Sequence, residues 1–172
     1  MNNKINELKD NSLKLLDSED FNLLAVIYLS IALEKQLRQV IIFNYRKSGL
    51  SAKFIRGRLL KLASFSHLLQ EFTWSNNKHL KINNLWKNER LSIKDLNGLL
   101  SIRNKIMHSV TSVSKDQIHN NVSDLIYVIE KFAVIFDKEF GFSGLEQLPK
   151  NISKDKLLLS NNILNRNVLS SK

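Results

Sequence analysis

The chain has 172 residues, 43% of them apolar, which is enough to bury a core and excludes a wholly disordered protein. Five glycines and one proline are too few turn formers for a many-stranded β-sandwich or barrel, and they favour helices. The absence of cysteine excludes disulfides, thiol catalysis and thiolate metal sites. The formal net charge of +10 is concentrated in one region, because residues 35–108 hold 15 basic and 3 acidic side chains.

The basic region begins with eight cations and no acid between Lys35 and Gln70. Such a block attracts phosphate groups and makes binding depend on salt, although it can also be a solvated basic surface. If it binds nucleic acid, we expect these residues to contact it: Lys35, Arg38, Lys53, Arg56, Arg58, Lys61 and Lys105.

Targeting and membrane signals are missing from the sequence. The first ten residues have no apolar signal core, and the longest strongly apolar run, residues 21–33, has 13 residues. Spanning a bilayer takes about 20 residues, so we interpret this run as a buried helix. We expect a cytoplasmic protein that does not contact a membrane.

The first half of the chain predicts three helices. Residues 2–17 form a short amphipathic helix, and residues 19–47 form a second one, capped by Ser18 or Asp20. Residues 21–33 are apolar nearly all round, so the second helix should be central in a bundle. Gly49 ends it, and a third helix starts near Ser51 and continues without a break through residues 56–72.

The second half predicts a polar loop and two more helices. Residues 73–90 are rich in asparagine and form the loop, residues 92–109 form a helix capped by Ser92 and Asp95, and residues 115–140 form the last long helix. Together these elements predict an all-α, up-and-down bundle of about five helices. We expect one domain over residues 1–148, with its core in 19–140, and a tail or short docking helix over 149–172.

The predicted helix at 92–109 carries an unusual charge. At 100° per residue, Arg103 falls in the middle of an apolar face, where an unpaired charge would cost several kcal/mol. Glu34 can pair with Arg103 across helices or with Arg38 one turn along its own helix. Arg103 is either a structural cation or a functional one. The apolar face comprises Leu96, Leu99, Leu100, Ile106, Met107 and Val110, and the adjoining polar stripe comprises Asn97, Ser101, Asn104, His108 and Thr111.

The other candidate side chains give weaker signals. Phe72, Trp74 and Trp86 flank the polar loop and either stack on unpaired bases or anchor the loop to the core. We expect His67 to be a partly buried helix residue. No spacing typical of a metal site, Gly-rich phosphate loop or serine nucleophile motif is present, so we expect no metal and no cofactor.

Residues 99–109, LLSIRNKIMHS, resemble the signature of the HEPN superfamily, in which an arginine and a polar residue precede a histidine near the end of a late helix. The long apolar helix before the motif, the basic middle of the chain and the long helix after it also resemble this superfamily. The resemblance covers about residues 19–140.

The resemblance implies an all-α bundle that dimerises so that two Arg–His motifs face one cleft. It implies a metal-independent endoribonuclease acting as a toxin or an anti-phage effector, with RNA as substrate and an antitoxin or defence-system protein as a possible partner. Arg103 would stabilise the phosphate charge, His108 would move protons, Asn104 would orient His108 or the phosphate, and Glu34 would be the supporting acid.

Two alternatives remain open from the sequence. In the first, the same fold is a non-catalytic module that binds nucleic acid or protein, with Arg103 as a structural cation. In the second, the chain is a basic helical DNA-binding or scaffold protein.

Overall fold

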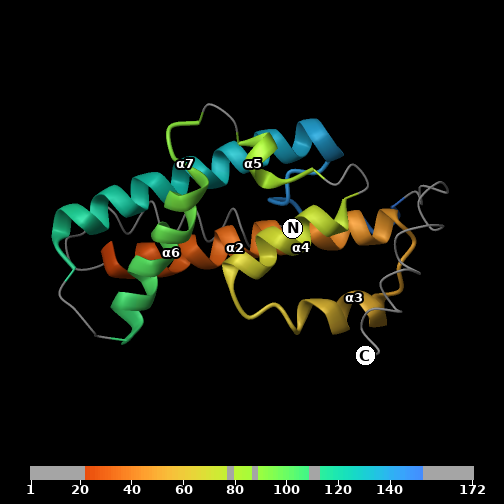
Figure 1. Ribbon diagram of the computed structural model, residues 1–172, viewed down its shortest axis with the longest axis horizontal. Helices are drawn as coiled ribbons and strands as arrows, with labels where there is room; N and C mark the ends of the chain where they lie inside the picture. Colours follow the sequence, from red (N-terminus) through yellow and green to blue (C-terminus); the bar gives the residue numbers. More distant parts are fainter. Residues whose placement is uncertain (1–21, 77–79, 87–88, 109–112, 153–172) are drawn as a thin grey trace.

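The all-α prediction is confirmed in the computed structural model, which describes residues 22–76, 80–86, 89–108 and 113–152. Within these ranges all regular structure is helical, and α5 is a single turn (Figure 1). The predicted helix at 2–17, the predicted start of the second helix and most of the predicted tail lie outside the described residues. The elements are α2 (Asn22–Lys47), α3 (Ala52–Leu59), α4 (Phe65–Ser75), α5 (Ile82–Leu85), α6 (Ile93–His108) and α7 (Lys115–Phe140).

Helix α2 is the central element, as its composition predicts. It packs against α3, α4, α6 and α7, and the side chains that it buries completely include Leu29, Leu33 and Leu37. Its first half is not covered all round, because Leu24 and Ile31 remain 40% and 43% exposed. These two residues are seven positions apart, so they lie on one stripe of the helix.

Helix α7 has the bounds predicted from the sequence, and its two ends show why. Ser114 accepts a hydrogen bond from the Gln117 N–H while the Gln117 side chain accepts one from Ser114, which forms a capping box. Gly141 ends the helix in the left-handed conformation at φ 72°. The buried face carries Phe132 and Phe136, whose rings lie 4.9 Å apart at their centroids.

The predicted single helix over residues 51–72 is wrong, because the chain breaks between α3 and α4. Ser64 caps the second piece by accepting a hydrogen bond from the His67 N–H at 3.3 Å. The break brings Arg58 of α3 to Glu71 of α4, where the guanidinium and carboxylate meet at 2.7 Å. In one continuous helix these residues, 13 positions apart, would be separated by about 20 Å.

The helices do not alternate strictly in direction, and α6 is where the alternation fails. Figure 1 shows α6 crossing α2 steeply, so that α7 then runs beside α2 in the same direction. Two contacts agree with this direction: the Gln36 Nε2 donates to the Ile129 carbonyl at 3.1 Å, and Phe43 stacks on Phe142 at 4.8 Å. Among the described helices, none is long and apolar enough to cross a bilayer.

Candidate functional site on helix α6

Helix α6 is held in place mainly through its first half. Ser92 and Asp95 form the predicted cap, with the Ser92 N–H donating to the Asp95 carboxylate at 2.7 Å. Leu96, Leu99 and Leu100 are buried against the core. The amide of buried Asn121 on α7 donates to the Leu99 carbonyl at 3.1 Å. These contacts fix the axis of the helix, and therefore the position of its last turns.

Arg103 lies where α6 crosses α2, and it is paired, as a charge on an apolar face requires. Its Nη1 donates to the Glu34 carboxylate at 2.9 Å, and the two side chains are only 24% and 25% exposed. Its Nε and Nη2 both donate to the Asn104 Oδ1, at 3.3 and 3.2 Å. These contacts use three of the five N–H groups of a guanidinium, so two can still bind an anion.

In the structure, Glu34 does not form the alternative pair with Arg38. Arg38 instead donates to the main-chain carbonyls of Leu59 and Leu62, at 3.3 and 3.1 Å. Those carbonyls lie at the end of α3, where a helix leaves acceptors without intrahelical partners. Arg38 therefore ties α3 to α2, and Glu34 is left to Arg103.

The polar stripe of α6 faces solvent. Ser101, Asn104 and His108 are exposed, and the Ser101 hydroxyl donates to the Gly98 carbonyl at 2.7 Å. The Asn97 side chain, Thr111 and Val110 lie outside the described residues. Asn104 and His108 are one turn apart on this stripe, so both can reach the same bound group.

The predicted apolar face of α6 is only partly buried. Ile106 is half-buried, but Met107 is 60% exposed, although both belong to the predicted apolar face. The reason is geometric: α6 crosses α2 instead of lying along it, so its last turn extends past the contact (Figure 1). The exposed Met107 lies one turn after Arg103.

The predicted nucleic-acid-binding residues fall into two groups. Lys53, Arg56, Lys61 and Lys105 are exposed, and Lys35 is half-buried. The other two, Arg38 and Arg58, hold helices together through hydrogen bonds within the protein. The exposed group is the part of the basic block that the structure leaves accessible to a phosphate backbone.

The sequence did not lead us to predict a hydrogen-bond network among Arg58, Glu71 and Tyr45. Glu71 is 3% exposed, accepts from the Arg58 Nε and Nη2 at 3.1 and 2.7 Å, and accepts from the hydroxyl of buried Tyr45. Burial first, and then the Glu71 carboxylate, raise the pKa of Tyr45 well above its ordinary value. This network could have been predicted from the position of Glu71 on the apolar stripe of Leu68 and Phe72. A charge in such a position needs a partner, as it does for Arg103.

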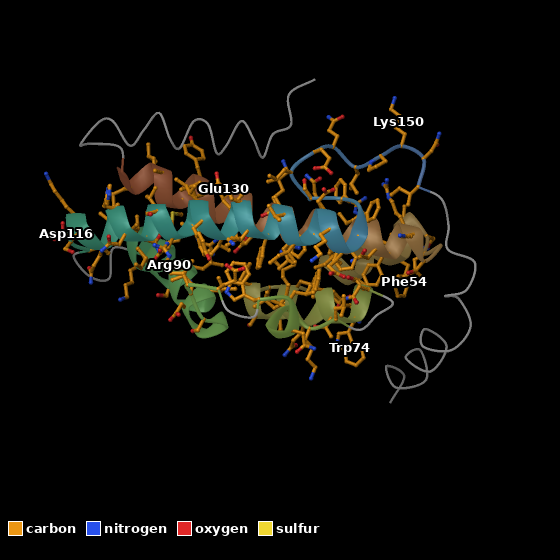
Figure 2. The ribbon with its side chains drawn as sticks, turned by 90° about the horizontal axis from the view of Figure 1, so that it is seen from above. Phe54, Trp74, Arg90, Asp116, Glu130 and Lys150 are labelled. Atoms are coloured by element: carbon orange, nitrogen blue, oxygen red, sulfur yellow. The ribbon has the colours of Figure 1, made fainter. Side chains whose placement is uncertain are left out.

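The aromatic residues beside the polar loop divide into buried and exposed side chains. Phe72 and Trp86 are buried at 0% and 4% exposure and anchor the loop, with the Trp86 Nε1 donating to the Leu91 carbonyl at 2.6 Å. Trp74 is 52% exposed and points outward from α4 (Figure 2), where it lines a hollow with Lys81. Base stacking therefore stays a prediction for Trp74 only.

His67, expected to be partly buried, is exposed on the first turn of α4, because the break at Ser64 places this turn at the start of a new helix. Within the described ranges, no group of three or more His, Asp or Glu side chains is placed to hold a metal ion. Comparison with models of known protein families, with curated proteins and with solved structures found no match to this chain.

Proposed function

We propose that this chain is a metal-independent endoribonuclease of the HEPN type, which cleaves RNA through its 2′-hydroxyl and acts as a toxin or anti-phage effector. One observation supports this most. Arg103 donates to Glu34 and Asn104 and has two N–H groups left. It lies within two turns of the exposed His108 on α6. The end of α6 thus presents a cation, an amide and an imidazole to solvent.

These groups supply what RNA cleavage needs from a protein. The nucleophile belongs to the substrate, so the site has to position the phosphate, move protons and offset developing negative charge. The remaining N–H groups of Arg103 can bind two phosphate oxygens in the planar geometry that guanidinium favours. The His108 imidazole can take the proton of the 2′-hydroxyl or give one to the leaving 5′-oxygen.

A second copy of the chain completes the proposed cleft. Arg103 and His108 are five residues apart, about 140° around the axis, so they do not share one face of α6. A two-fold axis near the end of α6 would supply a second arginine and a second histidine to the same phosphate. Exposed Ile31 and Met107 flank the Arg103–Glu34 pair, each about one turn away, and provide apolar surface for that contact.

The experiment is cleavage of single-stranded RNA in EDTA by purified protein and three variants. We expect His108→Ala and Arg103→Lys to lose at least about 100-fold in rate, the usual cost of removing a proton-transfer or charge-stabilising group. Both variants should stay folded, because His108 is exposed and lysine keeps the charge beside Glu34. His119→Ala, which changes an exposed histidine on α7, is the matched control and should cleave normally.

The second candidate function is a non-catalytic binding module of the same fold. The observation that favours it is that Glu34 and Asn104 already satisfy Arg103 in the way a structural cation requires. In that case wild-type protein would bind RNA without cutting it. Full activity of His108→Ala would overturn the ribonuclease proposal.

A further inference from the structure

A groove with an apolar floor and a basic rim lies between the second half of α2 and helix α3. Its volume is about 360 Å³, within the range of about 300–1,000 Å³ typical of ligand pockets. The residues that matter are Arg38, Ile42, Arg46, Arg56, Leu59 and Leu60. It lies apart from the α6 site, since none of the site residues lines it.

The charges around this groove all have one sign. Arg46 and Arg56 are exposed, and neither forms an ion pair with a described residue. No acidic side chain lines the groove. The third cation, Arg38, is fixed by its hydrogen bonds to the Leu59 and Leu62 carbonyls. Negative charge on an occupant would therefore be stabilised at the rim.

The floor is aliphatic and partly open to solvent. Ile42 and Leu59 are half-buried, and Leu60 at the mouth is 78% exposed. A single exposed leucine is ordinary, but here it adjoins a formed hollow between arginines. Arginine around an apolar centre is the composition enriched at protein interfaces.

We propose that this groove docks an acidic amphipathic helix of a partner protein. Apolar side chains at i, i+3 and i+7 of that helix would fill the floor over Ile42 and Leu59, and its Glu or Asp residues would pair with Arg46 and Arg56. The groove is preformed, because Arg38 locks α3 onto α2, which lowers the ordering cost of binding. The proposal does not depend on ribonuclease activity.

The composition of the groove favours a protein occupant over RNA. Phosphates need cations only, and unpaired bases stack on aromatic rings, whereas no aromatic side chain lines this groove. The aliphatic floor gains free energy only when another apolar group covers it.

The test uses the full chain and a fluorescent 16-residue helical peptide with leucines at i, i+3, i+7 and i+11 and glutamates on the flanks. Fluorescence anisotropy should show saturable binding that Leu60→Ser and Arg46→Gln each weaken at least about fivefold. The same peptide with glutamine in place of glutamate should bind more weakly. Val134→Ser and Lys138→Gln, at an exposed apolar and an exposed basic position of α7, are matched controls and should bind like wild type.

Single-stranded RNA is the second probe in the same assay. Because Leu60 is exposed, Leu60→Ser should keep its melting temperature within about 2 °C and should leave RNA binding unchanged. The proposal is overturned if the acidic peptide does not bind, or if Leu60→Ser binds it as wild type does. It is also overturned if Leu60→Ser weakens RNA and peptide equally, since the groove would then be a nucleic-acid site.

Discussion

Two charged side chains on apolar helix faces, Arg103 and Glu71, are the residues that most constrain this protein. Each needs a partner from another helix, because an unpaired charge in such a position costs several kcal/mol. Arg103 pairs with Glu34 across the α2–α6 crossing. Glu71 of α4 pairs with Arg58 across the α3–α4 break and with Tyr45 of α2. Each pair therefore selects one arrangement of its helices over others with similar apolar contacts.

The Tyr45–Glu71 contact predicts a loss of stability at alkaline pH. Burial and the neighbouring carboxylate raise the pKa of Tyr45 above the value of 10.0 expected in the unfolded chain. The stabilisation is therefore fully present below about pH 10 and is lost as the pH rises from there toward the folded pKa. Urea denaturation at pH 8 to 11.5 should show this loss, and Tyr45→Phe, which has no proton to release, should show a shallower one. Equal slopes for both proteins would contradict the assignment.

Gly144 predicts a sharp local sensitivity. Its φ is +80°, and a Cβ there would lie 2.8 Å from both the Gln36 carbonyl oxygen and the Val40 Cγ2 on α2. Gly144→Ala should lower the free energy of unfolding by about 3 kcal/mol, from left-handed strain plus overpacking. Gly141→Ala has a similar φ of +72° with no atom within 4 Å, so it should cost about 1 kcal/mol. Equal shifts of the urea midpoint would show that the close approach to α2 carries no cost.

At the scale of elements, one arginine of α2 supports the end of α3. Arg38 supplies the donors for two carbonyls at the end of α3, which is only eight residues long and buries only Ile55. A helix this short is marginal without such support.

Arg38→Gln should therefore loosen α3 selectively. We expect amide hydrogen exchange in α3 to speed up about tenfold or more, with exchange in α4 and α7 unchanged. Lys53→Gln, which removes an exposed cation from α3 itself, is the matched control and should leave α3 protected. Unchanged protection in Arg38→Gln would show that Ile55 packing and the Arg58–Glu71 pair hold the helix without Arg38.

For the whole molecule, the exposed apolar side chains next to the α6 site predict a symmetric dimer. Ile31 and Met107, each about one helical turn from the Arg103–Glu34 pair, are 43% and 60% exposed. We expect wild-type protein to sediment as a dimer at micromolar concentration, and the double variant Ile31→Ser, Met107→Ser to sediment as a monomer. Val134→Ser, which removes a more exposed apolar group from α7, should remain dimeric. A monomeric wild-type protein would contradict the two-fold cleft.

The amino-acid sequence by itself determined the all-α class, the bounds of α7, the cap of α6 at Ser92 and the need of Arg103 for a partner. These features follow from helical periodicity, capping side chains and the cost of an unpaired charge, all of which act over a few residues. Only the tertiary structure decided that Glu34 pairs with Arg103 instead of with Arg38. It also decided that Met107 lies outside the core and that residues 51–72 form two helices. The reason is that these outcomes depend on contacts between helices. The angle of α6 to α2 and the burial of Glu71 against Arg58 are set by side chains on different helices, which local patterns do not relate.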